Sequence, residues 1–163
     1  MISSLQILQL ISVFIGAFIG ALIANKITSK KDAKILKFNV DDANTPILTV
    51  KQDDIELNFI IDTGSSVSAI DISALNNICS QKLKKSTNIV GIEGTFMEVD
   101  CYEIPFSYNN YEYNHTFVAK DFTAAFTPLV DVIKKPIHGL IGSDFCEEHG
   151  FIIDFQTCTI NAK

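Results

Sequence analysis

The clearest chemical signal in this 163-residue chain is a single aspartate, Asp62, in a distinctive local sequence. It follows the apolar run Phe59–Ile61 and precedes Thr63, Gly64 and Ser65. The apolar run places the carboxylate at the end of a buried strand, while Gly64 permits a tight turn that a side chain would block. Hydroxyls beside the turn offer hydrogen bonds that hold the carboxylate in one orientation. Taken alone, this segment is as typical of a turn with a capping aspartate as of a catalytic loop.

A second motif lies further along the chain. Gly139–Gly142 is an apolar strand bounded by glycines, Ser143–Phe145 follows it, and a further apolar strand occupies Phe151–Phe155. The two motifs, in this order, resemble those of the single-domain retropepsin-like aspartic proteases, a family that includes bacterial members. The resemblance covers residues 45–161, which is nearly all of the chain beyond its N-terminal region.

The resemblance implies a role for each matching residue. Asp62 matches the catalytic aspartate, and Thr63 matches the residue whose hydroxyl bonds across a dimer to the partner loop. Gly64 matches the glycine whose amide contacts the carboxylate, and Ser65 the position that bonds its outer oxygen. Gly142 matches the glycine of the strand that packs behind the active loop and supports it.

The resemblance also places a flap, a glycine-bearing hairpin that covers the substrate, at residues 91–94. These are Gly91, Ile92, Glu93 and Gly94. Glu93 is charged at a position where an apolar tip is more usual in the family. Ile70, Ile92 and Phe96 are candidates for the walls of substrate side-chain pockets.

The chemistry of this family needs two carboxylates that share a proton, one acting as general base and the other as general acid. The chain has a single Asp-Thr-Gly and is too short for a two-lobed enzyme, so a symmetric homodimer must supply the second Asp62. Asp144 and Asp154 are the alternatives within one chain. Asp144 stands at a predicted helix start, where capping explains it, and Asp154 lies in a predicted strand. His138 has no Ser or Cys partner in a recognisable frame, which argues against a histidine-based triad.

The elements that position these residues are mostly short strands separated by turn signals. Residues 55–61 alternate apolar and polar side chains, the pattern of a half-buried strand that leads into Asp62. The expected elements are strands at 47–50 and 55–61, a short helix within 70–79, and hairpins at 88–104 and around Asn109–Asn110. They continue with a connection at 123–136 that has room for one or two helical turns, a strand at 139–142, a helix at 143–149 and two closing strands around Gln156–Thr157. This predicts an all-β, barrel-like domain over residues 35–163, with one or two short helices.

The N-terminal region predicts a membrane anchor. Residues 5–24 are uncharged and almost entirely apolar, and about twenty residues match the hydrocarbon thickness of a bilayer. We assign residues 1–25 to a transmembrane helix and the lysine-rich residues 26–34 to a juxtamembrane linker. Lysines follow the span and none precedes it, which favours a protease domain facing the cytoplasm. A cleaved signal peptide on a secreted or periplasmic enzyme is the alternative, although residues 1–4 carry no lysine.

A ridge of small residues runs through the predicted span. Ser12, Gly16, Gly20 and Ala24 recur at every fourth position. Such ridges let two helices approach closely in lipid, although Gly and Ala are also common in spans generally. Because the catalytic loop calls for a dimer, we expect the Gly16–Gly20 ridge to help pair two chains.

Composition argues against several classes of function. The formal charge is −6 and all thirteen basic residues are lysine, which argues against a nucleic-acid partner. The four cysteines show no zinc-ligand spacing, so no metal and no organic cofactor are expected. The resemblance implies an aspartic endopeptidase that cleaves a protein or peptide substrate as a homodimer. The alternative is a non-catalytic, membrane-bound interaction module that retains the same fold.

Overall fold

The computed structural model describes residues 35–41, 44–90 and 94–162. Residues from Ile35 onward form one compact unit. The predicted span at 5–24, the linker at 26–34 and the flap residues 91–93 lie outside the described residues. Within the described part, no helix has both the length and the apolar character needed to cross a membrane.

The described unit is mostly β-structure, in two sheets. Its strands are β1 (Ile35–Lys37), β2 (Asn39–Val40), β3 (Pro46–Gln52), β4 (Ile55–Ile61), β5 (Ala69–Asp71), β6 (Gln81–Val90), β7 (Phe96–Tyr108), β8 (Tyr111–Lys120), β9 (Gly139–Ile141), β10 (Phe151–Asp154) and β11 (Thr159–Ala162). The larger sheet has the order β2-β3-β4-β9-β5-β8-β7-β6, and an additional pairing of β3 with β7 bends it round on itself. The smaller sheet has the order β1-β11-β10.

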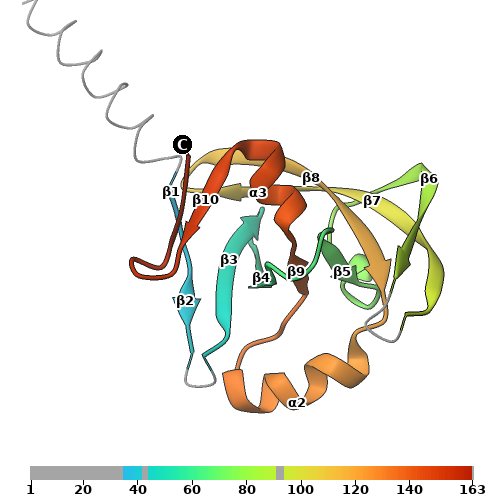
Figure 1. Ribbon diagram of the computed structural model, residues 1–163, viewed down its shortest axis with the longest axis horizontal. Helices are drawn as coiled ribbons and strands as arrows, with labels where there is room; N and C mark the ends of the chain where they lie inside the picture. The colour runs from blue at the N-terminus through green and yellow to red at the C-terminus, as the bar shows by residue number, and fades with distance from the viewer. Residues whose placement is uncertain (1–34, 42–43, 91–93, 163) are drawn as a thin grey trace, which may run out of the picture. The chain divides into compact units, whose positions relative to one another are not determined.

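The hairpin of β3 and β4 delivers the aspartate loop, as the alternating pattern predicted. The strands pair antiparallel, with Leu48 opposite Phe59. Both side chains are fully buried. Strand β9 then pairs with β4 in parallel, with Ile141 beside Ile61. The ends of the two motif strands therefore lie next to each other at the centre of the unit (Figure 1).

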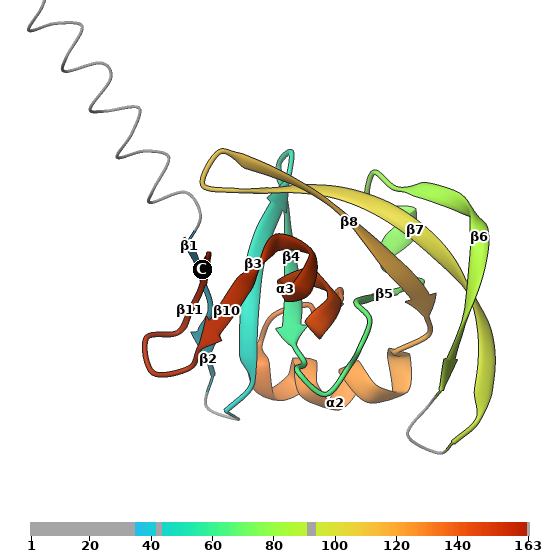
Figure 2. The same cartoon turned by 45° about the horizontal axis from the view of Figure 1, so that its top comes forward.

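Two long hairpins cover the central strands (Figure 2). The turn between β7 and β8 is at Asn109–Asn110, as predicted, and both asparagines have positive φ angles of 50° and 64°. This left-handed pair is the geometry of a tight two-residue hairpin turn, and asparagine tolerates it better than most residues. The pairing of β6 with β7 runs from Gln81 to Glu103, so this hairpin is much longer than the predicted 88–104.

Two segments differ from the prediction. The expected helix within 70–79 is instead β5 followed by one short 3-10 turn, η1 (Ala74–Asn76). The expected connection at 123–136 contains an eleven-residue helix, α2 (Thr123–Ile133), with Pro128 inside it. An internal proline argues against a helix, but here buried Phe126 anchors α2 in an apolar cluster with Ile47 and Ile137.

Helix α3 (Ser143–His149) confirms the prediction for that segment and follows directly from β9. Helices α2 and α3 lie on opposite sides of the central strands (Figure 1). Beside α3, the aromatic core brings together Phe59, Phe106, Phe117 and Phe145, each at most 1% exposed. Phe59 and Phe117 stack at a ring separation of 5.2 Å. This dense packing makes a rigid base for the loops at the ends of β4 and β9.

Candidate active site

The two sequence motifs meet through backbone hydrogen bonds. The Asp62 amide donates to the Ile141 carbonyl at 2.9 Å, which joins the end of β4 to the end of β9. The Ser143 amide and hydroxyl both donate to the Ser65 carbonyl, at 2.9 and 3.1 Å. The aspartate loop is thus closed against the start of α3, although the two segments are far apart in the sequence.

The loop holds the Asp62 carboxylate with its own backbone. The Gly64 amide donates to Oδ1 of Asp62 at 3.0 Å, and the Ser65 amide donates to the Asp62 carbonyl at 3.1 Å. A Cβ on Gly64 would lie 3.3 Å from the same Oδ1, so only glycine leaves this approach uncrowded. Asp62 is half-buried, while Thr63 and Gly64 are exposed. The carboxylate is therefore oriented by the chain and still accessible.

Ser65 does not make the bond that the resemblance implied. Its hydroxyl donates to the Val67 carbonyl at 2.7 Å, and among the described residues no hydrogen bond joins it to Asp62. A hydroxyl has one proton to donate, so this bond directs Ser65 into the loop backbone instead. Thr63 is exposed, and its hydrogen bond across a dimer stays a prediction.

Gly142 lies where the loop and the start of α3 come closest. A Cβ at this position would lie 2.5 Å from the Val67 carbonyl carbon and 2.6 Å from its oxygen. Both are backbone atoms that cannot move aside without shifting the loop. The Gly142 amide also donates to the Ser68 hydroxyl at 3.0 Å. A side chain at this position would therefore push the aspartate loop away from α3.

Sequence analysis did not predict a buried polar network that holds the aspartate loop. Its centre is Ser68, which is fully buried, whereas Thr63 in the same loop is exposed. The Asp144 carboxylate accepts the Ser68 amide at 2.8 Å and the Ser68 hydroxyl at 2.7 Å. Nε2 of His115 lies 3.0 Å from the same hydroxyl. Burial alone would raise the pKa of Asp144, but hydrogen bonds from His115 and Ser68 outweigh it and hold the pKa below its ordinary value.

The same network has the outline of a serine-histidine-glutamate triad. Nε2 of His115 faces the Ser68 hydroxyl, and Nδ1 of His115 lies 2.7 Å from Oε2 of Glu148. Burial rules out a nucleophilic role for Ser68, because no substrate carbonyl can reach a fully buried hydroxyl. Its proton is moreover used in the bond to Asp144. The sequence prediction against a histidine-based triad concerned a different residue, His138. Nδ1 of His138 accepts a hydrogen bond from the Asn58 amide at 3.0 Å.

The two rival aspartates have structural partners in the chain. Asp144 holds Ser68, which is a larger role than the predicted helix cap. Asp154 ends β10, and its Oδ1 accepts the amides of Gln156 and Thr157 at 2.8 and 3.2 Å. The side-chain and backbone hydrogen bonds of Thr157 lower the pKa of Asp154. Each carboxylate is therefore committed to holding a turn or a loop.

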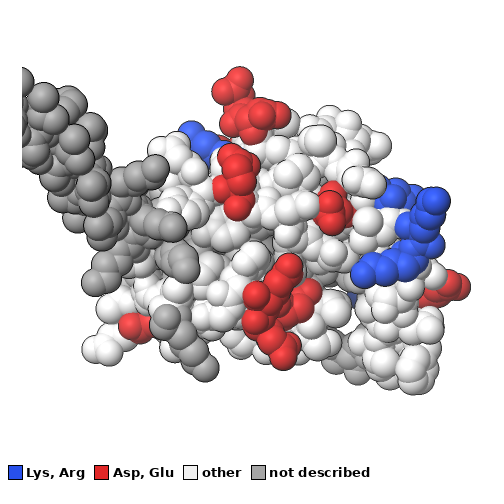
Figure 3. Space-filling model, turned by 90° about the horizontal axis from the view of Figure 1, so that it is seen from above, with Lys and Arg blue, Asp and Glu red and all other residues white. Residues whose placement is uncertain are grey.

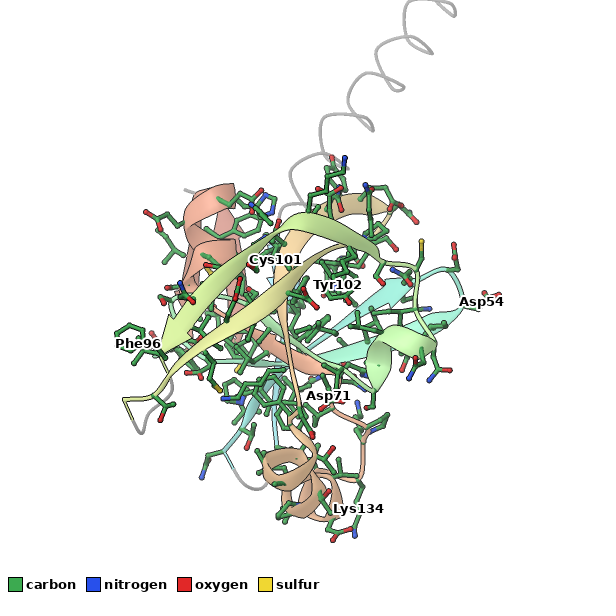
Figure 4. The ribbon with its side chains drawn as sticks, turned by 90° about the vertical axis from the view of Figure 1, so that its right-hand side faces the viewer. Asp54, Asp71, Phe96, Cys101, Tyr102 and Lys134 are labelled. Atoms are coloured by element: carbon green, nitrogen blue, oxygen red, sulfur yellow. The ribbon has the colours of Figure 1, made fainter. Side chains whose placement is uncertain are left out.

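The β6–β7 hairpin occupies the predicted flap region. Of the four predicted flap residues only Gly94 is described, with a φ of 74° that glycine adopts readily. Phe96 is 76% exposed and projects from the end of this hairpin (Figure 4). Ile70, by contrast, is fully buried in the core, so the prediction that it lines a substrate pocket is wrong.

Comparison with known proteins adds a distant likeness to solved structures. No family model matches the chain, and no curated protein matches it. Among solved structures, the chain is similar to EIAV protease complexed with the inhibitor HBY-793, with 18% sequence identity and a TM-score of 0.48. The alignment covers 69% of this chain and 94% of that chain. At this level of similarity, function rests on the geometry of the residues described above.

Proposed function

We propose that the chain is a membrane-anchored, retropepsin-like aspartic endopeptidase that works as a homodimer. The observation that carries the proposal is the Asp62 carboxylate, held by the Gly64 amide at 3.0 Å in a loop that leaves it accessible. The loop is closed by the contacts of Ser143 with Ser65, so both sequence motifs contribute to one site. No metal or organic cofactor takes part in this chemistry.

In the proposed reaction the two Asp62 carboxyls of the dimer share one proton. The ionised carboxylate takes a proton from a water molecule, whose oxygen attacks the peptide carbonyl carbon. The protonated partner gives its proton to the carbonyl oxygen, so a neutral tetrahedral diol forms. Collapse of the diol breaks the C–N bond, a proton passes to the leaving amine, and the shared-proton state returns. The apparent pKa values belong to the pair of carboxyls and not to either one.

The hydrogen bonds of the rival carboxylates support a second chain as the source of the second Asp62. Asp144 and Asp154 are occupied by hydrogen bonds within the chain. The residues that surround Asp62 on its open side, Thr63 and Gly64, are exposed in a single chain. An isologous two-fold contact would cover these residues and bring one Asp62 to the other, because each copy presents the same patch.

A substrate would lie extended between the Asp62 loops and the β6–β7 hairpins. Extended peptides pair their backbone with strand edges, which leaves their side chains to set specificity. The exposed apolar residues at the end of the hairpin, Val90 and Phe96, are suited to contact such side chains. We propose the flap at Gly91–Gly94 between these two residues.

The membrane part of the proposal rests on the sequence alone. The apolar residues 5–24 would anchor the chain as a single pass, with the protease domain facing the cytoplasm. Pairing through the Gly16–Gly20 ridge would raise the effective concentration of the two domains. Dimer fractions in membranes would then fall for a Gly16→Ile/Gly20→Ile double variant, and an unchanged fraction would refute this part.

The decisive experiment is cleavage of a diverse peptide library by the full-length chain in detergent, from about pH 3 to about pH 8. Asp62→Asn removes the proposed general base and keeps the side-chain shape. Asp54→Asn is the matched control, because Asp54 is exposed in the distant β3–β4 turn (Figure 4). Cleavage by the wild type and by Asp54→Asn, and none by Asp62→Asn, is expected. Equal cleavage by Asp62→Asn would refute the mechanism, and no cleavage by a chain shown to be dimeric would favour the interaction module.

A further inference from the structure

Three potential metal-binding side chains gather where the end of α3 packs against β8. They are His115 from β8 and Glu148 and His149 from the last turn of α3. One nitrogen or oxygen from each lies within 4.8 Å of those from the other two. His115 is 3% exposed, whereas the Glu148 side chain is 53% exposed, so the cluster runs from the interior to the surface. None of these residues belongs to the proposed catalytic loop.

The hydrogen bonds of Ser68 determine which nitrogen of His115 carries a proton. The Ser68 hydroxyl lies within hydrogen-bonding distance of three groups: the Asp144 carboxylate, the Gly142 amide and Nε2 of His115. An ionised carboxylate only accepts, so the single hydroxyl proton goes to Asp144. The amide only donates and takes one lone pair of the oxygen. The remaining lone pair must receive a proton from Nε2 of His115.

With this assignment, Nδ1 of His115 needs a partner that carries a positive charge. In a neutral imidazole with its proton on Nε2, Nδ1 carries a lone pair. That lone pair faces Oε2 of Glu148 at 2.7 Å, and two acceptors at this distance repel each other. A positive species must therefore lie between His115 and Glu148. It is either an additional proton, which makes an imidazolium, or a metal cation.

His149 distinguishes between these two possibilities. Its Nε2 is buried and has no hydrogen-bond partner among the residues that the structure describes. Its ring is fixed by Phe145, at a centroid distance of 4.7 Å, and by Tyr113 at 5.4 Å. An additional proton on His115 would satisfy Glu148 but would leave the buried nitrogen of His149 without a partner.

We propose that His115, Glu148 and His149 bind one divalent transition-metal ion, of which Zn²⁺ fits best. Two imidazoles and one carboxylate are a typical borderline ligand set for zinc, with a fourth position left for water. An open cavity of about 480 Å³ borders His115 and Glu148 and gives solvent access to that position. Figure 3 views the molecule from the side of α3, and several groups of acidic side chains lie on that face, which favours a cation.

The three ligand atoms, which all lie within 4.8 Å of one another, must adjust their separations for the ion to fit. Zinc binds imidazole nitrogen and carboxylate oxygen at about 2.0–2.2 Å, so tetrahedral ligand atoms stand about 3.3 Å apart. Glu148 must therefore withdraw slightly from its present 2.7 Å contact with His115. Its side chain is more than half exposed and is free to do so, whereas the buried imidazole stays in place. The His115 ring is already held in orientation, because its Nε2 donates to the Ser68 hydroxyl.

The ion would act as a structural clamp. It would join the end of α3 to β8, and through the bond of His115 to Ser68 it would brace the back of the aspartate loop. It touches none of the reacting atoms, so it adds no step to the proposed hydrolysis. Zinc affinity is accordingly independent of Asp62, and the Asp62→Asn variant should bind the ion as tightly as the wild type.

The test uses the full-length chain after treatment with a chelator, titrated with Zn²⁺ by calorimetry and followed by thermal unfolding. One ion per chain and a rise in melting temperature are expected. Glu148→Gln and His149→Gln should each weaken binding more than about tenfold, since loss of a residue that only hydrogen-bonds to a metal ligand already costs about that much. The matched control is Glu147→Gln, because Glu147 is the neighbouring carboxylate and also borders the cavity but does not belong to the cluster.

Two results would overturn the proposal. The first is equal zinc binding by all four proteins, which would place the ion elsewhere on the chain. The second is no binding by the wild type together with NMR evidence of an imidazolium at His115, which would assign the positive charge to a proton. Substitution of Co²⁺ adds a direct readout, because its visible spectrum reports the ligands and should change in His149→Gln but not in Glu147→Gln.

Discussion

The Asp144 carboxylate holds Ser68 by two hydrogen bonds. The Ser68 amide donates to Oδ2 of Asp144 at 2.8 Å, and the Ser68 hydroxyl donates to Oδ1 at 2.7 Å. The neighbouring residue Ser143 binds the Ser65 carbonyl at the front of the same loop. The start of α3 therefore holds the aspartate loop at two points. Movement of the loop would expose a buried serine and leave an ionised carboxylate without its donors.

Ser68→Ala should destabilise the fold by about 1–3 kcal/mol, because the Gly142 amide and the Asp144 carboxylate each lose a buried partner. Ser66→Ala is the matched control. Ser66 is exposed two residues earlier, and surface changes of this kind stay within about 0.5 kcal/mol. The measurement is the free energy of unfolding in denaturant for the two variants. Equal values would show that the network adds nothing to stability.

Gly142→Ala should be more damaging, costing about 3 kcal/mol or more, since its Cβ would overlap the Val67 backbone at 2.5–2.6 Å. Gly150→Ala serves as the control at the other end of α3. Its φ of 63° imposes some strain on alanine, but nothing lies within 4 Å of the added Cβ. Unfolding midpoints should therefore fall further for Gly142→Ala. A larger fall for Gly150→Ala would contradict the close approach at Gly142.

Thr63 tests the proposed dimer. Thr63→Val removes the hydroxyl that the family resemblance assigns to a contact across the two-fold axis, while Thr63→Ser keeps it. Thr63 is exposed in a single chain, so neither change should alter monomer stability by more than about 0.5 kcal/mol. We expect Thr63→Val to lower the dimer fraction in sedimentation experiments and to lower cleavage with it. Identical dimer fractions for the two variants would contradict this role.

The sequence predicted the elements whose pattern is local. The alternation at 55–61 identified β4, the Asn109–Asn110 pair identified a hairpin turn, and α3 lies at 143–149 as expected. It did not predict the short strand β5, because residues 70–79 were expected to form a helix. Ile70 was a candidate for the wall of a substrate pocket, and it lies in the core.

The polar network shows a second limit. Ser68 and His115 are 47 residues apart, and Ser68 and Asp144 are 76 apart. Strand and helix periodicities indicate which face of an element is buried, but they do not indicate which loop packs against which strand. The residues have ordinary surface chemistry in the sequence, and their role follows from the pairing of β5 with β8 and with β9. For the same reason, the sequence did not predict the cluster of His115, Glu148 and His149.

His138 links stability to pH through a single hydrogen bond. Its Nδ1 accepts the Asn58 amide at 3.0 Å, so the proton of the neutral ring is on Nε2. Burial lowers the pKa of His138 below its ordinary value. In the unfolded chain the same side chain titrates near its ordinary value. Between these two pKa values the unfolded state therefore binds more protons than the folded state.

The contribution of His138 to stability should accordingly be complete above about pH 6.5 and decline as the pH falls through its folded pKa. His138→Asn keeps an acceptor near the Asn58 amide but does not titrate. The difference in unfolding free energy between wild type and His138→Asn should therefore change with pH in this window and level off below it. Other groups titrate in both proteins and cancel in the difference. A difference that stays constant from about pH 8 to about pH 5 would show that His138 is protonated equally in both states, and the buried neutral imidazole would have to be abandoned.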